Sequence, residues 1–432
     1  MFKYCLGFAL ITPLLGMILV ESGAYCWQCG RFGYPNGASI AFAAYALTVL
    51  LTFAIVIRLR SRTVTKQTVA KQSGGSFVSL ALVILIVNTL FLFTLLFGAG
   101  GIRVLLGEAE KINFRVKLGL LGALSFWILK YLAPSSLAYL AVIYRRSRAG
   151  GFAPKVLLGL NLLMVSLIGL AWGFKTSALI ILLPSLLILY WTVSLRQMAV
   201  LLLVALLITV GTAVFFDRSD YRFQNLRQVL VFIGTRATVL QGDVAWHVWD
   251  LYRNGEALPD YWRTLLPFVG DRLFSILSGI TRDNFSLWAS YHYESALTHL
   301  AGYPLEDVEQ GLNTTATPFA EGVIALGAPG FLLFGVIAGA VSAANYSLIK
   351  SALAEGRART AAIASTYFGW IVFPWLNGGG ITVLFHISVF IGIFLSYMML
   401  ISFEFLAPLL GTPPARTERL VMDREPLPSE PT

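Results

Sequence analysis

Charge is scarce in this chain. Only 12% of its 432 residues are charged, whereas 57% are hydrophobic. Soluble globular proteins carry about 25% charged residues. The scarcity therefore excludes an ordinary soluble protein and indicates a polytopic membrane protein.

Metal and nucleotide motifs are also missing. The four histidines and three cysteines do not show the Cys-and-His spacing of a zinc site. The chain has no phosphate-binding glycine loop, dinucleotide fingerprint or kinase signature. We therefore expect no metal and no cofactor, and we do not expect a soluble nucleotide as substrate.

Apolar runs long enough to cross a bilayer dominate the chain. A hydrocarbon core about 30 Å thick needs about 20 apolar residues per helix, and backbone groups in lipid must be paired within helices. The sequence therefore predicts an all-α polytopic membrane protein with about ten transmembrane helices, the first of them retained rather than removed as a signal peptide. The runs are residues 5–20, 41–56, 77–97, 118–143, 156–172, 177–191, 199–215, 322–342, 360–375 and 381–403.

Positive charge lies on alternate loops. Short loops rich in Lys and Arg stay cytoplasmic, and with the N terminus inside one set of loops holds a single acid, Glu355. We therefore expect cytoplasmic termini and an outside location for residues 216–321. The net charge of +10 then reflects orientation rather than nucleic-acid binding. The inside residues are Lys3, Arg58, Arg60, Arg62, Lys66, Lys71, Arg145, Arg146, Arg148, Lys155, Arg196, Lys350, Arg357 and Arg359.

The runs divide the chain into four parts. Residues 1–215 contain helices 1–7, and residues 321–405 contain helices 8–10. Between helices 7 and 8, residues 216–320 form one large outside loop domain. Its apolar stretches 226–240 and 265–280 are expected to lie in the membrane interface. Residues 406–432 are proline-rich and predict a disordered cytoplasmic tail.

The loop domain combines arginines with aromatic residues. It has eight arginines and no lysine, and the guanidinium group suits phosphate or carboxylate. We select Arg222 and Arg236 for pyrophosphate, and Trp246, Trp288 and Tyr291 as platforms for sugar rings. The alternative is structural, with arginines paired to nearby aspartates and lipid headgroups.

Three further cations are candidates for anion binding. Lys175 lies in a tight turn between the fifth and sixth runs, and Arg103 lies in the outside loop after the third. Lys130 lies near the centre of the fourth run, where a lysine costs about 2.5 to 3.5 kcal/mol. It either faces an anion or extends along a tilted helix to the interface.

A carboxylate lies where the polar loop meets an apolar helix. Glu321 follows a Thr- and Asn-rich turn, and partial burial would raise its pKa toward that of a general base. The alternative is an acid that favours the helix N terminus. His292 and His299, with Glu294 between them, are further base candidates, and His386 is expected inside the last helix as a core residue.

Two cysteines form a CWQC sequence in the first outside loop. Cys26 and Cys29 fit a short disulfide in an oxidising compartment. A redox-active pair normally lies at a helix start in a thioredoxin-like fold. A structural pair is therefore the interpretation we favour, with a redox role as the alternative.

Layout and motifs together resemble a family, the bacterial O-antigen and exopolysaccharide repeat-unit polymerases of the Wzy type. The shared layout is about ten spans with a large outside loop late in the chain. The shared motifs are the Gly-Phe-Lys-Thr turn at 173–176 and the stretch 313–330, NTTATPFAEGVIALGAPG. Many relatives carry arginine where this chain has Lys175, and again in the last outside turn, here Asn377 followed by three glycines.

The resemblance implies a function at the outer face of the bacterial inner membrane. There the enzyme would transfer a glycan from undecaprenyl pyrophosphate onto another carrier-linked repeat unit, inverting the anomeric centre without metal. Glu321, His292 or His299 would take the acceptor proton. Implied partners are lipid-linked oligosaccharide, membrane lipids, a chain-length regulator and a flippase, with no nucleic acid. The alternatives are an O-antigen ligase and a lipid-linked oligosaccharide transporter.

Overall fold

The fold is all-α. The computed structural model describes residues 1–60, 74–105, 119–147, 151–171, 180–216, 226–310, 312–314 and 316–409. Within these residues the strands are β1 (Tyr25–Cys26) and β2 (Arg31–Phe32), which pair antiparallel with Tyr25 opposite Phe32. The expected tail lies almost wholly outside the described residues.

Seven helices of the described part are long and apolar enough to cross a membrane, which confirms a polytopic membrane protein. They span Phe2–Glu21, Ala38–Arg60, Phe77–Gly98, Leu124–Ser147, Phe152–Ala171, Ala328–Ala354 and Ile381–Leu409. Helix α11 (Leu195–Phe216) covers the seventh expected run, and α10 (Leu183–Leu189) covers part of the sixth.

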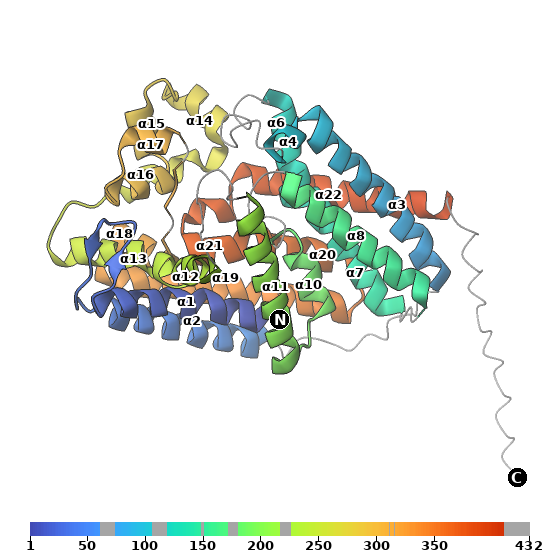
Figure 1. Ribbon diagram of the computed structural model, residues 1–432, viewed down its shortest axis with the longest axis horizontal. Coiled ribbons are helices and arrows are strands. Elements are labelled where there is room, and N and C mark those ends of the chain that lie inside the picture. The colour runs from blue at the N-terminus through green and yellow to red at the C-terminus, as the bar shows by residue number, and fades with distance from the viewer. Residues whose placement is uncertain are drawn as a thin grey trace, which may run out of the picture.

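One group of helices surrounds the largest apolar core. Helix α1 (Phe2–Glu21) packs on α13 (Val239–Arg253), and α2 (Ala38–Arg60) packs on α19 (Ala328–Ala354). Helix α18 (Pro318–Leu326) packs between α13 and α19. Figure 1 shows α1 and α2 side by side along one edge of the molecule.

A second group packs beside the first. Helix α7 (Ala133–Ser147) lies against α3 (Gly74–Phe93), α8 (Phe152–Ala171), α10 and α20 (Ala358–Tyr367), and α22 (Ile387–Leu406) closes the group. Buried amides join its helices, because Asn161 donates to the Ala81 carbonyl at 3.1 Å and Ser136 donates to Asn88 at 3.2 Å. Such hydrogen bonds add to packing where the hydrophobic effect is weak.

Three long apolar helices contain π-helical turns. These are η2 (Thr94–Gly98) after α3, η3 (Ile128–Leu132) between α6 (Gly119–Trp127) and α7, and η5 (Phe368–Val372) between α20 and α21 (Phe373–Gly378). Such turns are rare and are frequent at functional sites. One of them, η3, carries Lys130.

The membrane span expected at residues 322–342 has different bounds in the structure. Helix α18 ends at Leu326, and Gly327 adopts a φ of 66°, which favours glycine over other residues. The membrane-spanning helix α19 then begins at Ala328 and continues to Ala354. The expected span therefore contains a helix break, and the stretch around Glu321 is a separate short helix.

Short helices gather at one end of the molecule (Figure 1). They are the 3-10 helix η4 (Tyr261–Val269), α14 (Asp271–Ser278), α15 (Phe285–Ser290), α16 (Tyr293–Leu300) and α17 (Leu305–Glu309). The expected interfacial stretch 226–240 corresponds to α12 (Leu226–Ala237). The stretch 265–280 is not one helix, because Gly270 separates η4 from α14.

The crossing of α1 and α13 depends on two glycines. A Cβ at Gly16 would meet the Thr238 carbonyl and the Gly242 backbone, and a Cβ at Gly242 would meet the backbone of Pro13 and Met17. Small residues let helix backbones approach closely in membranes.

We expect Gly16→Ala to destabilise the protein by about 1 to 3 kcal/mol, since overpacking of a close contact costs this much. Gly7 lies on the same helix, and a Cβ added there would meet nothing within 4 Å, so Gly7→Ala is the matched control. Thermal denaturation in detergent micelles measures both. Equal melting temperatures for the two variants would contradict the close crossing.

Candidate functional site

Glu321 lies in a closed cage of hydrogen-bond donors. The residue is 1% exposed. Oε1 accepts from the Tyr261 hydroxyl at 2.9 Å and from the Ile381 N–H at 2.6 Å, and Oε2 accepts from the Trp375 indole at 3.2 Å. Glu321 therefore joins α18 to η4, to α21 and to the 3-10 helix η6 (Ile381–Leu384).

The turn before η6 lets backbone groups reach this cage. Gly379 and Gly380 have φ values of 71° and 77°, and a Cβ at Gly379 would collide with the Ala316 carbonyl and the Tyr293 ring. The Ala316 N–H also donates to the Gly378 carbonyl at 3.3 Å. Gly379 thus allows close packing against the stretch before Glu321.

Burial dominates the electrostatics of Glu321. It raises the pKa of the carboxyl from 4.5 to about 7, although the hydrogen bonds from Ile381, Tyr261 and Trp375 act in the opposite direction. Proton exchange near neutral pH suits a general base. Hydrogen-bond donors, however, occupy both carboxylate oxygens of Glu321. A substrate would have to displace these donors to reach the oxygens. The arrangement fits a positioning role, and the catalytic role stays a prediction.

A second cluster of ionisable groups surrounds His292. Its Nδ1 contacts the Trp288 carbonyl oxygen at 2.9 Å, and its Nε2 contacts Asp271 Oδ1 at 3.2 Å. A carbonyl and an ionised carboxylate both only accept hydrogen bonds. With Asp271 ionised, each ring nitrogen of His292 faces an oxygen acceptor. The hydrogen bond from His292 correspondingly lowers the pKa of Asp271.

Lys130 joins this cluster from the membrane side. Its ammonium group lies 4.6 Å from the Phe126 ring centroid and interacts electrostatically with Glu294. Glu294 reaches solvent and accepts from the Asn313 amide at 3.1 Å. Surrounding protein atoms raise the pKa of Glu294, and Lys130 and His292 partly offset this rise. Lys130 and His292 thus both act on Glu294, and His292 also contacts Asp271.

His386 belongs to the same neighbourhood, in a different position from the expected one. It is the N-cap of α22 rather than a residue inside the last helix, and its Nδ1 accepts from the Ser388 N–H at 3.2 Å. A Cβ at Gly270, next to Asp271, would lie 3.9 Å from its Nε2. The expected core histidine therefore faces the charge cluster.

Of the three aromatic residues expected to stack on sugar rings, Trp288 and Tyr291 lie next to the cluster, whereas Trp246 does not. Trp288 stacks on the His292 ring with centroids 3.6 Å apart, and the Arg263 guanidinium lies 5.9 Å from the Tyr291 ring centroid. Trp246 is fully buried beneath Arg31, whose guanidinium is 5.2 Å from its ring centroid. A buried indole cannot stack on a sugar, so the prediction for Trp246 is wrong.

The remaining expected cations and His299 are not brought to the cluster by any described contact. Arg236 lies on α12 with its guanidinium 4.9 Å from the Phe232 ring centroid. Arg103 is exposed on α4 (Gly101–Leu105). His299 contacts the Tyr303 carbonyl at 3.2 Å, at the far end of α16 from His292. Lys175 and Arg222 lie outside the described residues.

Several site residues give no signal in the sequence. Asp271, Tyr261 and Trp375 are aspartate and aromatic residues in segments with no motif. Glu321 lies 60 residues from Tyr261 and 54 from Trp375, and no local pattern predicts such pairs. The position of Asp271 directly after Gly270 at a helix start is the one available sign, since acids favour helix N termini.

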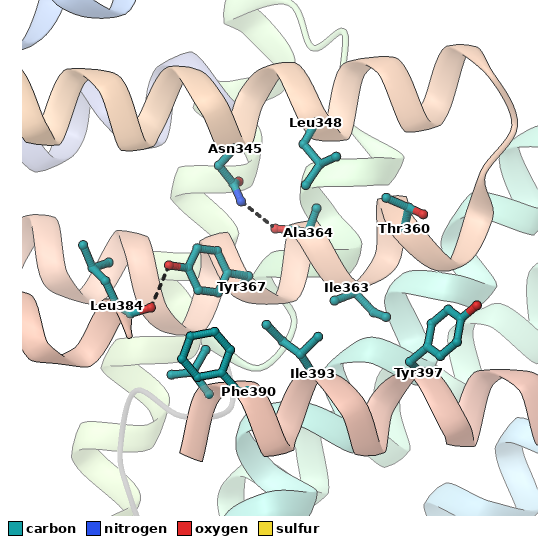
Figure 2. A pocket seen from close by; sticks show the side chains of 11 residues that line it. Asn345, Leu348, Thr360, Ile363, Ala364, Tyr367, Leu384, Phe390, Ile393 and Tyr397 are labelled. Atoms are coloured by element: carbon teal, nitrogen blue, oxygen red, sulfur yellow. Dashed lines mark hydrogen bonds between the residues drawn. The ribbon is translucent and has the colours of Figure 1, made fainter. Parts of the chain in front are cut away.

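An apolar pocket of about 390 Å³ lies between α19, α20 and α22. Figure 2 shows Leu384 and Phe390 at one end and Thr360 and Tyr397 at the other. The Tyr367 hydroxyl donates to the Leu384 carbonyl at 3.0 Å. Leu384 ends η6, whose first residue binds Glu321, and His386 follows two residues later. One end of the pocket is therefore continuous with the segment that forms the site.

No protein-family model, curated protein or solved structure matches this chain.

Replacement of Glu321 by Gln tests the burial of its carboxyl group. The folded pKa of about 7 lies above the ordinary 4.5, so the folded state binds the proton more tightly. The resulting stabilisation is complete below the ordinary pKa and is lost as the pH rises through the folded pKa, by roughly 3 kcal/mol.

We expect the melting temperature of the wild type to fall relative to that of Glu321→Gln between about pH 4.5 and pH 7. Thermal denaturation in detergent micelles measures it. The control is Glu306→Gln, which changes an exposed carboxylate on α17. A difference between wild type and Glu321→Gln that does not depend on pH would count against the buried carboxyl group.

Proposed function

We propose that this protein polymerises oligosaccharide repeat units carried on a polyprenyl pyrophosphate. The observation that carries the proposal is the charged cluster of Lys130, His292, Glu294 and Asp271 near His386, which follows two residues after Leu384 in the lining of an apolar pocket. This arrangement matches an amphiphile with an anionic head and a hydrocarbon tail. The glycan part of the proposal rests on the resemblance of the sequence to the Wzy-type polymerases.

The cations would hold the pyrophosphate of the donor. Lys130 and His292 both act electrostatically on Glu294, and His292 also contacts Asp271 at 3.2 Å. As the bond to the anomeric carbon breaks, negative charge develops on the leaving pyrophosphate, and positioned cations stabilise it. Lys130 approaches from a membrane helix, so it suits a headgroup whose tail remains in the bilayer.

Glu294 is the carboxylate best placed to take the acceptor proton. It reaches solvent, whereas Glu321 is enclosed. Desolvation raises the pKa of Glu294 above the ordinary value, and a carboxylate of higher pKa is the stronger base. Glu321, through Trp375 and Ile381, would fix the turn that carries His386. Trp288, stacked on His292, offers a face to a sugar ring.

The decisive experiment uses purified protein in lipid nanodiscs with an undecaprenyl-pyrophosphate-linked repeat unit as donor and acceptor. We expect longer carrier-linked glycans by gel and mass spectrometry. Glu294→Gln should slow elongation about 100-fold or more, since a positioned base contributes this much. Glu306→Gln in the same domain is the control. Full activity of Glu294→Gln would reject its role as the base.

Two other outcomes would replace the proposal. Transfer of the glycan to lipid A core in the same assay would identify a ligase, and movement of the substrate across a vesicle membrane without elongation would identify a transporter. In a gene-deletion strain, lipopolysaccharide with single-repeat caps is expected, whereas bare core would favour the ligase.

The pocket should bind part of the lipid tail. Ile393 lines the pocket, and Ile391 lies exposed on the same helix. An indole at residue 393 would displace about two methylene groups of lipid, which corresponds to about 1.6 kcal/mol and about a tenfold rise in KM.

We expect Ile393→Trp to raise the KM for a long-chain donor and to leave a short-chain donor unaffected. Ile391→Trp is the matched control and should change neither. Steady-state kinetics with the two donors measure the effect. An equal rise in KM for both donors would show that the pocket does not bind the tail.

A further inference from the structure

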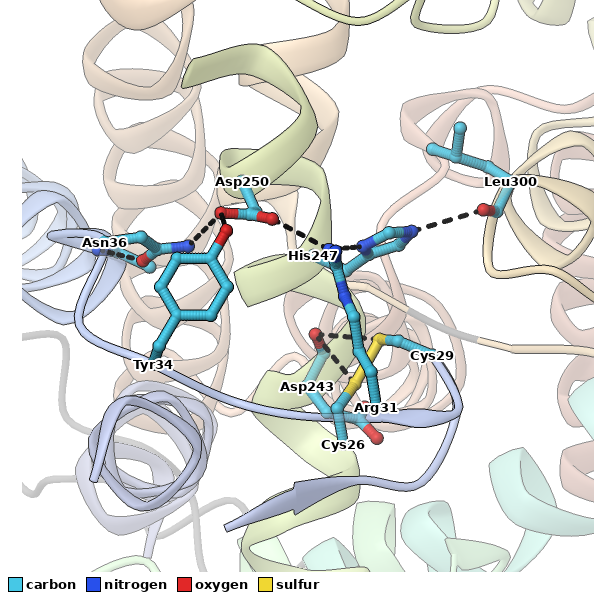
Figure 3. Close-up of polar contacts among 10 residues, drawn as sticks. Cys26, Cys29, Arg31, Tyr34, Asn36, Asp243, His247, Asp250 and Leu300 are labelled. Carbon is cyan, nitrogen blue, oxygen red and sulfur yellow. Dashed lines mark hydrogen bonds and ion pairs between the residues drawn. A yellow bond between two sulfur atoms is a disulfide. The ribbon is translucent and has the colours of Figure 1, made fainter. Parts of the chain in front are cut away.

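A disulfide lies in the loop between α1 and α2, against α13. Cys26 and Cys29 are bonded, and Figure 3 shows them beside Asp243. Cys26 is fully buried, whereas Cys29 retains exposed surface. Thiol–disulfide exchange depends on which sulfur an attacking thiolate can reach. Of the two residues, only Cys29 has exposed surface.

A backbone carbonyl beside the disulfide can accept hydrogen bonds from the thiols of the reduced form. The main-chain carbonyl oxygen of Asp243 lies 3.8 Å from Cys26 Sγ and 3.7 Å from Cys29 Sγ. Sulfurs of a disulfide carry no hydrogen, so neither sulfur can donate to this carbonyl in the oxidised state. After reduction each thiol becomes a weak donor. The same backbone atom can then accept from either thiol.

The loop is held on α13 by contacts that do not pass through the S–S bond. The Gln28 N–H, within the CWQC sequence, donates to Asp243 Oδ2 at 3.1 Å. Arg31 donates to His247 Nδ1 at 2.7 Å and forms an ion pair with Asp250 at 2.8 Å. Tyr34 donates to Asp250 at 2.6 Å. Opening the disulfide therefore leaves the loop anchored on α13 within the CWQC sequence and after it.

The protonation states of His247 and Asp243 on α13 support this anchoring. His247 Nε2 faces the Leu300 carbonyl at 3.3 Å while Nδ1 faces Arg31, so the ring is neutral with its proton on Nε2. Burial and the nearby Arg31 lower the pKa of His247 accordingly. Burial raises the pKa of Asp243 to about 7. Its carboxyl group has no ion pair among the described residues and serves to hold the loop.

We propose that Cys26–Cys29 is a thiol–disulfide exchange site whose partner is a protein dithiol, with Cys29 as the attacked sulfur. A thiolate of the reductant forms a bond to Cys29 Sγ, and the Cys26–Cys29 bond breaks with its electron pair on Cys26 Sγ, which takes one proton. The second thiolate of the reductant then attacks the reductant's own sulfur in the mixed disulfide and releases Cys29, which takes the other proton. The reductant leaves as a disulfide, having given two electrons and two protons.

The first test uses full-length protein in nanodiscs with Cys5, the buried free cysteine, replaced by Ala. The protein is incubated with a reduced thioredoxin-type dithiol protein, and free thiols are then labelled with a maleimide polymer that shifts the band on a gel. We expect Cys29 to be labelled in the folded protein, at a rate within about tenfold of that in detergent-denatured protein, because exposure controls exchange. The buried Cys26 should be labelled only when the reduced protein is subsequently denatured. Labelling of Cys29 only after denaturation would show a structural disulfide.

The second test identifies the attacked sulfur. A reductant whose second cysteine is replaced by Ser cannot complete the exchange, so it stays bound as a mixed disulfide. Mass spectrometry of the trapped complex should place the bond at Cys29. A bond at Cys26, or no trapped complex, would overturn the proposal. Both tests use unmodified Cys26 and Cys29, and neither depends on glycan polymerisation.

Discussion

A carboxylate removed from water is the constraint on which the candidate site depends. Glu321 brings together a phenol from η4, an indole from α21 and a backbone N–H from η6. A buried charge without such partners would cost several kcal/mol, so these elements must converge wherever the carboxylate is ionised. The residue thus ties the short helices at one end of the molecule to the membrane helices beneath them.

Around this cage, the ionisable groups separate into enclosed and accessible ones. Glu321 is enclosed and satisfied, whereas Glu294 and Asp271 reach solvent. Their partners, Lys130 and His292, come from a membrane helix and from the turn before α16. Under the proposed function, this division gives support to one carboxylate and contact with substrate to another, as environment does elsewhere for paired acids.

The sequence predicted the class of the protein well, because hydropathy and the need for internal backbone pairing constrain membrane helices strongly. It also located Glu321, Lys130 and His292, since a carboxylate at a helix start, a lysine within an apolar run and a histidine among aromatic residues are visible locally. It failed for Trp246, which looks like a surface aromatic residue until Arg31 covers it. The partners of Glu321 lie too far away in the chain for any local pattern to reveal them.

The π-helical turn η3 has a consequence for the orientation of α6. A π-turn amounts to one residue inserted into an α-helix, and each residue of a helix turns the following side chains by about 100°. Loss of a single residue between Ile128 and Leu132 would restore a regular helix and rotate the segment before it, including Phe126, relative to the packed face of α7. The length of this one turn therefore determines which side chains of α6 face the packed helices.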